Sequence, residues 1–295
     1  MTTLYVDIPE APQGSSPVGL ILGKPPHMLH QRLEAAHLPK IASLQLVRAL
    51  NAQQEAYFVP STDGAESRFE FRIGPGQGGV PPAQFEFMEN QFTKPSAELR
   101  GAIRDLIKEA RDQHEEIGRL VEFTASLFDY DHPKHKFYEG KDEIPLLTRL
   151  TKGSCQDINT FLISSLYAAE IPSAYYSGYF FEAGKPQSTF WFHCWISTLV
   201  DGEQQDWDIA HHMKHGLTTI GPALNPVAGR RVALSHGRGL RFPIANGLEA
   251  VIPQLGQPVW FYENGESVPA GATATLIEDG ESDDASSTRI LEISA

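Results

Sequence analysis

The sequence predicts an α+β fold in which two helical segments pack on an antiparallel sheet. Apolar residues recur at helical spacing across residues 96–129 and again across residues 155–169. Three strand-like segments follow, at residues 173–181, 189–200 and 204–210. The last two are joined at Asp201-Gly202, a dipeptide that favours a tight hairpin turn and therefore antiparallel pairing.

Residues 1–95 are expected to form a smaller β-rich unit, and residues 96–295 a main domain that ends in β-hairpins. Within the first unit, "YFVP", "RFEFRI" and "QFEFME" indicate strands, and "MLHQRLEAAHL" indicates a helix. The stretch "GPGQGG" fits the spacing GxGxxG. Prolines follow it, where a phosphate-binding loop would open a helix, so we expect a turn. In the tail, "PVWFYENGESV" and "TATLIEDG…STRILEIS" indicate hairpins.

The boundaries of the helical segments have local signals. Ser96 precedes Glu98 and predicts a helix start, from which one long helix or two consecutive helices run to residue 129. A loop is expected over residues 131–152. The second helical segment ends at Ile171-Pro172, because a residue before proline avoids the helical conformation.

Composition excludes several classes of function. The net charge of −13 disfavours nucleic acid, which needs clustered lysine and arginine. No apolar run is long enough to span a membrane and no secretory signal is visible, so we expect neither membrane association nor export. With only two cysteines, a disulfide framework is not expected and a cytoplasmic setting is. The acidic stretch "EDGESDDASS" lacks the ligand spacing of a calcium loop, so a solvated turn is expected.

Cys155 stands at the predicted start of the second helical segment. Unpaired N–H groups and the helix dipole favour an anion there, so we expect a lowered thiol pKa and a nucleophilic thiolate. The neighbouring backbone N–H groups could bind an oxyanion. The alternative is a small buried thiol that packs a helix against a sheet.

The predicted hairpin brings a possible base next to a carboxylate. If the chain turns at Asp201-Gly202, alternation puts His193 and Asp208 on one face as diagonal neighbours, within reach of a hydrogen bond. The other ring nitrogen of His193 would then be free to take the Cys155 proton. Cys194 points to the opposite face and is expected to be structural. The alternative is a polar pair on a half-solvated sheet face.

Four segments together resemble the transglutaminase-like superfamily. They are Gly153-Ser154-Cys155-Gln156-Asp157, "AAEIPSAYYSGYF", "FHCWI" and "DWDIAHH", and the resemblance covers about residues 105–215. It implies a papain/transglutaminase-like core with the triad Cys155, His193 and Asp208, and a capping role for Asp157. "LSHGRGLRFPIANG" also resembles a late segment of bacterial members, with Gly239 where an aspartate is usual.

The resemblance implies an enzyme without a cofactor that attacks an amide or thioester carbonyl through Cys155. Acyl transfer to an amine is preferred, with an amide or a carrier-bound thioester as donor and an acyl carrier protein as a candidate partner. An amidase or cysteine peptidase with the same triad is the alternative, and a non-catalytic binding module is a second one.

The remaining site residues are also expectations. Trp191, Trp195 and Tyr179 could line an acyl pocket, and Tyr130 or Tyr138 could donate to the oxyanion. His211 and His215 have the i, i+4 spacing of zinc ligands. They lack the glutamate of HExxH and an evident third ligand, so no metal site is expected.

Overall fold

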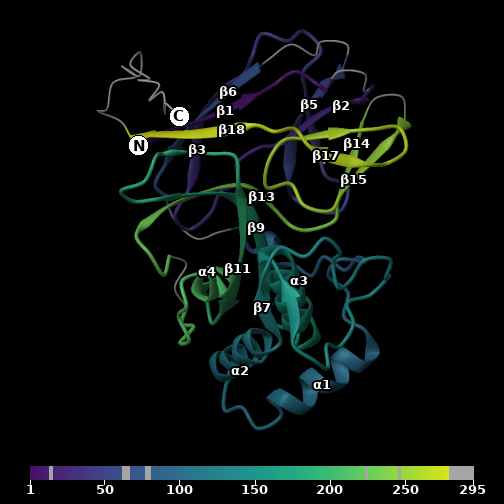
Figure 1. The fold of residues 1–295 in the computed structure, drawn as a ribbon, viewed down its shortest axis with the longest axis vertical. Helices are drawn as coiled ribbons and strands as arrows, with labels where there is room; N and C mark the ends of the chain where they lie inside the picture. Colours follow the sequence, from purple (N-terminus) through teal and green to yellow (C-terminus); the bar gives the residue numbers. More distant parts are fainter. Residues whose placement is uncertain (13–15, 62–66, 77–80, 223–224, 245–246, 279–295) are drawn as a thin grey trace, which may run out of the picture.

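The computed structural model has a β-rich half above a half in which helices cover a central sheet (Figure 1). It describes residues 1–12, 16–61, 67–76, 81–222, 225–244 and 247–278. No helix in these ranges is long and apolar enough to cross a membrane.

The central sheet has the strand order β12-β11-β9-β13, and each neighbouring pair is antiparallel. Its strands are β9 (Ser173–Glu182), β11 (Phe192–Val200), β12 (Glu203–Trp207) and β13 (Gly229–His236). The predicted antiparallel sheet is therefore confirmed. The predicted third strand is too long, because β12 stops at Trp207 and Asp208 caps the short helix α4 (Ile209–Lys214).

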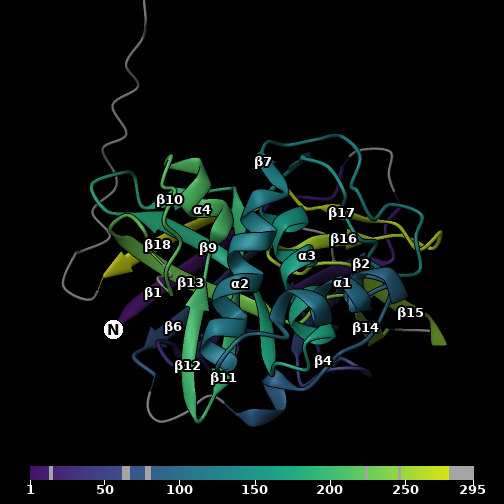
Figure 2. The ribbon, with the colours of Figure 1, turned by 90° about the horizontal axis from the view of Figure 1, so that it is seen from below.

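Three helices lie on one side of this sheet: the third packs on its strands, and the first two pack against the third (Figure 2). They are α1 (Ala97–Ile107), α2 (Gln113–Ser126) and α3 (Cys155–Ala168). Ser96 caps α1 as expected, since its side chain accepts from the Leu99 N–H. Asp112 caps α2 in the same way, so residues 96–129 form two helices and not one. Within the loop region, β7 (Phe128–Tyr130) and β8 (Thr151–Gly153) pair in parallel.

The β-rich half contains two five-stranded sheets. The first sheet has the strand order β10-β18-β1-β6-β3. Its strands are β10 (Ser188–Thr189), β18 (Thr273–Glu278), β1 (Thr2–Ile8), β6 (Ser67–Gly74) and β3 (Arg32–His37). The second sheet has the strand order β17-β16-β2-β5-β4. Its strands are β17 (Ser267–Pro269), β16 (Val259–Phe261), β2 (Gly19–Gly23), β5 (Glu55–Pro60) and β4 (Gln45–Arg48). A further hairpin joins β14 (Leu240–Pro243) to β15 (Glu249–Ile252).

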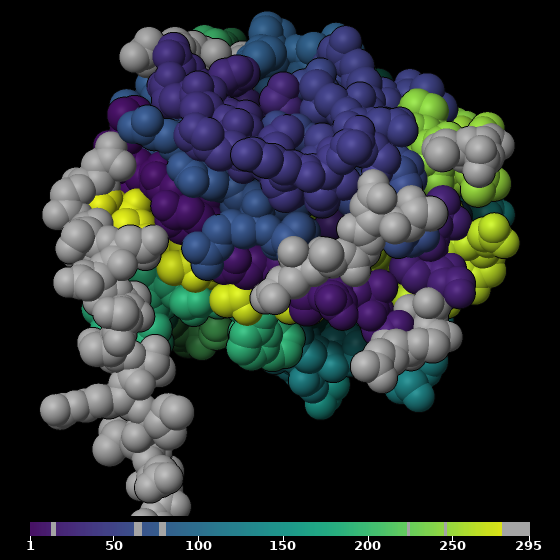
Figure 3. Space-filling view, turned by 90° about the horizontal axis from the view of Figure 1, so that it is seen from above, coloured from purple at the N-terminus to yellow at the C-terminus, as the bar shows by residue number. Residues whose placement is uncertain are grey.

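Both five-stranded sheets combine strands from the two ends of the chain. Figure 3 shows the N-terminal residues in purple and blue, with the yellow C-terminal segments beside them. β1 lies between β18 and β6, and β2 lies between β16 and β5. The β-rich unit expected at residues 1–95 therefore also includes strands from residues 188–278.

Two predicted elements of this unit are wrong. The helix expected at "MLHQRLEAAHL" is strand β3, which pairs with β6. The strand expected at "QFEFME" is a short 3-10 helix, η2 (Pro82–Phe85), followed by a loop. The hairpin at "PVWFYENGESV" is confirmed as β16 and β17. Part of "GPGQGG", at residues 77–80, and the acidic stretch from residue 279 lie outside the described residues.

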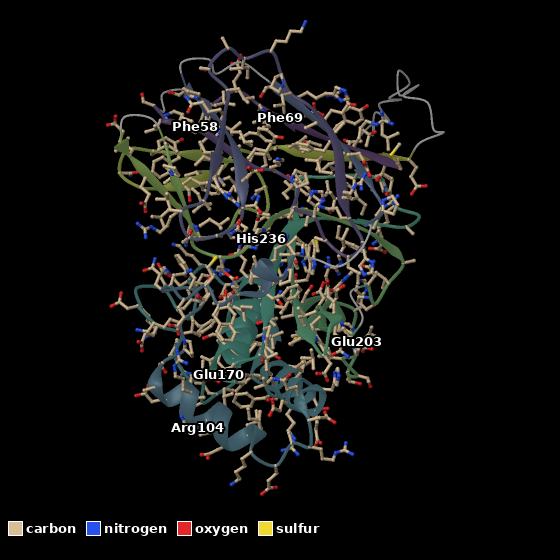
Figure 4. The ribbon with its side chains drawn as sticks, turned by 180° about the vertical axis from the view of Figure 1, so that it is seen from behind. Phe58, Phe69, Arg104, Glu170, Glu203 and His236 are labelled. Carbon is tan, nitrogen blue, oxygen red and sulfur yellow. The ribbon has the colours of Figure 1, made fainter. Side chains whose placement is uncertain are left out.

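An apolar core joins the two halves. Side chains from both five-stranded sheets pack with those of β9 and β13, including Tyr179 and Leu234. In Figure 4, Phe58 and Phe69 lie in the β-rich half and His236 lies between the halves. The central sheet is thereby held between the helices and the β-rich half, so its strands can hold site residues in place.

Candidate active site

The first turn of α3 positions Cys155. Its N-terminus is closed by a capping arrangement in which the Asp157 carboxylate accepts from the Ser154 N–H at 2.9 Å and from the Ser154 hydroxyl at 2.7 Å. The predicted capping role of Asp157 is therefore confirmed. Glycine is required at position 153, just before this cap, because a Cβ there would lie 2.6 Å from the Phe128 ring. Cys155 is thus the first residue of the helix, where backbone N–H groups have no partner within the helix.

The β11–β12 hairpin brings His193 to Asp208. The observed register runs from Val200 opposite Glu203 to Ile196 opposite Trp207, as predicted. Asp208 follows directly, and its Oδ2 lies 2.6 Å from His193 Nε2. When the imidazole is neutral, this bond requires the proton on Nε2. The lone pair is then on Nδ1, where it can accept a proton.

Arg231 of β13 lies behind this pair. Its Nη2 is 2.5 Å from Asp208 Oδ2 and 2.8 Å from His211 Nδ1. Burial opposes ionisation of Asp208, but the charges of His193 and Arg231 hold the pKa of its carboxyl well below the usual range. Asp208 is thus a buried anion between the Arg231 guanidinium and the His193 imidazole. Sequence reasoning missed Arg231, because it comes from another strand and no motif marks it.

The same guanidinium bears on the zinc alternative. Ligand atoms of His193, Asp208 and His211 lie within 4.8 Å of one another, which is compatible with a metal ion. Burial lowers the pKa of His211 to about 3, so its neutral ring accepts a hydrogen bond from Arg231. The Arg231 cation therefore already uses the lone pairs of Asp208 and His211 that a metal would need. This arrangement indicates that the Arg231 guanidinium, and not a zinc ion, supplies the positive charge at this position.

Cys194 lies against the Cys155 thiol, which corrects the sequence prediction. It follows His193 on β11 and points toward α3, in the same core as Cys155. Asn159 of α3 donates to its carbonyl oxygen at 3.0 Å and approaches its sulfur at 3.5 Å. Alternation did place Cys194 opposite His193. The error was the assumption that this face lies away from the nucleophile.

The two thiols titrate as a pair. The hydrogen bond with Cys194 and burial raise the pKa of Cys155, contrary to the lowered value expected from its helix position. Burial opposes ionisation of Cys194 too, but the neighbouring Cys155 thiol, the charge of His193 and the nearby Tyr175 hydroxyl lower its pKa to about 6. The pair therefore loses one proton readily and the second with difficulty.

This coupling gives a testable pH dependence. Because the Tyr175 hydroxyl stabilises the thiolate of the pair, we expect Tyr175→Phe to raise the pKa of the first ionisation. The rate of iodoacetamide labelling, which follows the thiolate, should then rise at higher pH than in the wild type. The measurement is the labelling rate of each cysteine by mass spectrometry between about pH 4 and pH 10. An unchanged profile would mean that the hydroxyl does not support the thiolate.

No hydrogen bond joins His193 to Cys155 among the described residues. Cys194, the residue after His193, and Asp208, the partner of His193, both act on the Cys155 thiol, so the pair of His193 and Asp208 lies in the same region as the nucleophile. Catalytic hydrogen bonds are often long in a free enzyme and shorten when substrate binds. The structure thus places His193 with Asp208 and Cys194 with Cys155. His193 and Cys194 are consecutive residues of β11.

The two tyrosines proposed for the oxyanion differ in their surroundings. Tyr130 lies near both thiols and Asp208, and burial raises its pKa, so its hydroxyl stays protonated and can donate. The Tyr138 hydroxyl instead accepts a hydrogen bond from Arg238. Tyr130 is therefore better placed for the role that the sequence suggested.

The three aromatic residues proposed for an acyl pocket are separated. Trp195 and Tyr179 are fully buried core residues, so neither lines an open pocket in this structure. Trp195 stacks on Tyr176 and lies under the Arg231 guanidinium. Trp191 is 71% exposed and contacts Phe190, so it alone of the three is accessible.

A pocket of about 530 Å³ opens beside the start of α3, although neither thiol is among its lining residues. Gln156 and Phe192, which are adjacent in sequence to Cys155 and His193, contribute to its wall. The loop of residues 138–142, the turn of residues 253–257 and strands β16 and β17 complete it. The C-terminal strands therefore help to form the candidate substrate site, although the triad lies in the middle of the chain.

Comparison with known proteins finds similarity to the family that the sequence motifs resemble. A family model described as the transglutaminase-like superfamily matches residues 100–208. A solved structure of a candidate cysteine protease from Cytophaga hutchinsonii is similar at a TM-score of 0.51 and 14% identity, over 93% of this chain and 96% of that one. The periplasmic domain of TgpA from Pseudomonas aeruginosa gives 0.37 and 13%, over 72% and 88%. No curated protein sequence matches the chain.

Proposed function

We propose that the chain is a cysteine enzyme of the transglutaminase-like superfamily that transfers acyl groups to amines. The observation that supports the proposal is the hydrogen-bonded pair His193 and Asp208, whose carboxylate acts through space on the helix-start thiol of Cys155. Nucleophile, base and orienting carboxylate are the three parts that such chemistry needs.

In the first half-reaction the Cys155 sulfur attacks the carbonyl carbon of an amide or thioester. The thiol proton passes to Nδ1 of His193, while Asp208 stabilises the resulting imidazolium through Nε2. Backbone N–H groups of the first turn of α3, together with the Tyr130 hydroxyl, stabilise the oxyanion. The bond to the leaving amine or thiol then breaks, His193 returns its proton to that group, and a Cys155 thioester remains.

In the second half-reaction an amine attacks the thioester carbon. The amine gives its proton to His193, the carbon–sulfur bond breaks, and the proton returns to the sulfur as the new amide leaves. Water in place of the amine would give hydrolysis. The proposal favours transfer because Cys155 is only 7% exposed and aromatic side chains flank the site, which limits access of water.

Hydrolysis of an amide bond is the second candidate. The likeness to a candidate cysteine protease supports it, although at 14% identity that likeness concerns the fold. Both reactions share the Cys155 thioester and differ in what removes it. As part of the proposal, the donor is an amide or a carrier-bound thioester, with an acyl carrier protein as a partner. A reducing compartment such as the cytoplasm suits the two free thiols.

The deciding experiment is intact-mass spectrometry after incubation with acyl donors, with and without a primary amine. A Cys155 adduct that persists in water and disappears when amine is added supports transfer. An adduct that disappears equally fast without amine supports the hydrolase. The variant Cys155→Ser serves as the control for non-specific acylation.

We also expect activity to be independent of metal. The Arg231 guanidinium already neutralises Asp208 and bonds His211, so no divalent cation is needed to organise the site. Incubation with EDTA should leave the acylation rate of Cys155 unchanged. A loss that added zinc or calcium restores would contradict this prediction and revive the zinc alternative.

A further inference from the structure

Arg238 is a buried cation whose hydrogen-bond partners are all neutral. The residue follows β13 in the sequence, and its side chain is 2% exposed. Nη1 donates to the Pro253 carbonyl and to Gln254 Oε1, both at 3.2 Å, and Nη2 donates to the Tyr138 hydroxyl. Nε has no hydrogen-bond partner among the described residues. A guanidinium has five N–H donors, so part of its capacity is unused.

The surroundings compensate this charge only in part. The guanidinium carbon lies 5.3–5.4 Å from the ring centres of Phe92, Tyr138 and Tyr175, which stabilise a cation through their faces. Cys194 and Asp157 act on Arg238 through space, but neither is hydrogen-bonded to the guanidinium among the described residues, and the Asp157 carboxylate is already paired with Lys136 at 2.9 Å. A buried charge that lacks a hydrogen-bonded anion is costly, and a bound anion would lower that cost.

Arg238 lines the pocket beside the start of α3. The other unpaired charges of this pocket, including Lys141 and Asp142, lie on its exposed rim, where they oppose one another and are screened by salt. The charge of Arg238 is buried and is therefore screened much less. The pocket thus combines a neutral rim with a positive inner wall.

We propose that Arg238 binds a carboxylate of the acyl donor, so that the enzyme prefers donors with an acidic group near the reactive carbonyl. This inference rests on the proposed function, because it assigns the pocket to the acyl donor. A planar guanidinium fits a carboxylate with two parallel hydrogen bonds, which an ammonium group cannot reproduce. Arg238 and the aromatic rings around it then determine which donors bind, while Cys155 and His193 carry out the chemistry.

The first test measures binding without turnover. Glutarate should protect Cys155 from iodoacetamide in the wild type, whereas neutral glutaramide, of the same shape, should not. Protection should persist in about 0.5 M NaCl, because a buried charge is little screened. In Arg238→Gln, glutarate protection should fall at least ~10-fold, and Arg238→Lys should restore only part of it. Arg241→Gln is the matched control, since Arg241 pairs with Glu249 on the surface.

The second test measures acylation. The 4-nitrophenyl monoester of glutaric acid should acylate Cys155 at least ~10-fold faster than the corresponding ester of glutaramic acid, and Arg238→Gln should abolish that preference. Equal rates and equal protection in the wild type would overturn the proposal, as would a preference that survives in Arg238→Gln. If Arg238→Gln fails to fold, the wild-type comparison of charged and neutral probes decides alone.

The two tests separate this inference from the function on which it rests. Protection by glutarate without acylation by either ester would leave the carboxylate site standing and overturn the proposed acyl transfer. Acylation by both esters at equal rates, without protection by glutarate, would leave acyl transfer standing and overturn the carboxylate site.

Discussion

Replacing Cys155 by alanine should abolish formation of the acyl adduct and reduce turnover by at least ~10⁴-fold. No other group can supply the nucleophile at the first turn of α3. The fold should remain, because alanine removes only one sulfur from a core that many apolar side chains build. The measurements are intact mass after incubation with donor, steady-state turnover, and thermal melting as the check on folding.

Cys194→Ala is the matched control for this prediction. It removes the second sulfur of the pair but leaves the helix-start thiol, so acylation should continue at a rate lowered by no more than ~10-fold. The acidic limb of its pH–rate profile should move to lower pH, because Cys155 loses the neighbouring thiol that raises its pKa. An adduct on Cys194 in the Cys155→Ala variant would show that the nucleophile has been assigned to the wrong sulfur.

The second large effect is expected from the base. His193→Ala should lower turnover by about 10³- to 10⁴-fold, because the base and the acid for the leaving group are lost together. Asp208→Asn should cost less, since the imidazole remains but is left misoriented. It should also lower the melting temperature, because Arg231 would keep a buried charge without its anion.

Asp206→Asn is the control for Asp208→Asn. Asp206 is also a buried carboxylate of β12, but its partners are Ser197, Gln204 and His30, away from the thiols. We expect its variant to retain turnover. If both variants lose activity equally, the effect of Asp208 is one of folding, and its assignment to the triad fails.

The segments that carry the triad could be predicted because their signals are local. A capping sequence fixes where α3 begins, and Asp201-Gly202 fixes the register of the hairpin, so the approach of His193 to Asp208 follows from alternation. Asp201 and Gly202 both adopt positive φ, at 52° and 82°, as this turn type requires. Both signals act within a few residues and need no tertiary context.

The rest of the site depends on contacts between distant strands. Arg231 and Arg238 come from β13 and the turn after it. No motif marks Arg231, and the resemblance of the segment around Arg238 to a late segment of bacterial members does not indicate its contacts. The contact of Cys194 with Cys155 requires knowledge of which face of the sheet α3 covers. The thiol pKa was mispredicted for the same reason, since a helix start lowers it but a buried partner sulfur outweighs that effect.

The N-terminal errors have a similar cause. "MLHQRLEAAHL" contains good helix formers and reads as amphipathic, yet β3 is an edge strand held by its pairing with β6. Tertiary pairing overrode local preference there. "QFEFME" alternates as a strand does, but the two prolines just before it favour a short helical turn.

The pairing of β1 with β18 has a consequence for how the chain acquires its structure. Thr2 lies opposite Glu278, so this ladder closes a loop that spans almost the whole described chain. Pairings of such high contact order form slowly, because the entropy of closing the loop must be lost before the contacts compensate it. During synthesis, β1 and β2 would leave the ribosome long before β16 and β18 exist. Their exposed edges would be open to wrong pairing in that interval, and chaperones that shield unpaired strands should raise the yield of folded protein.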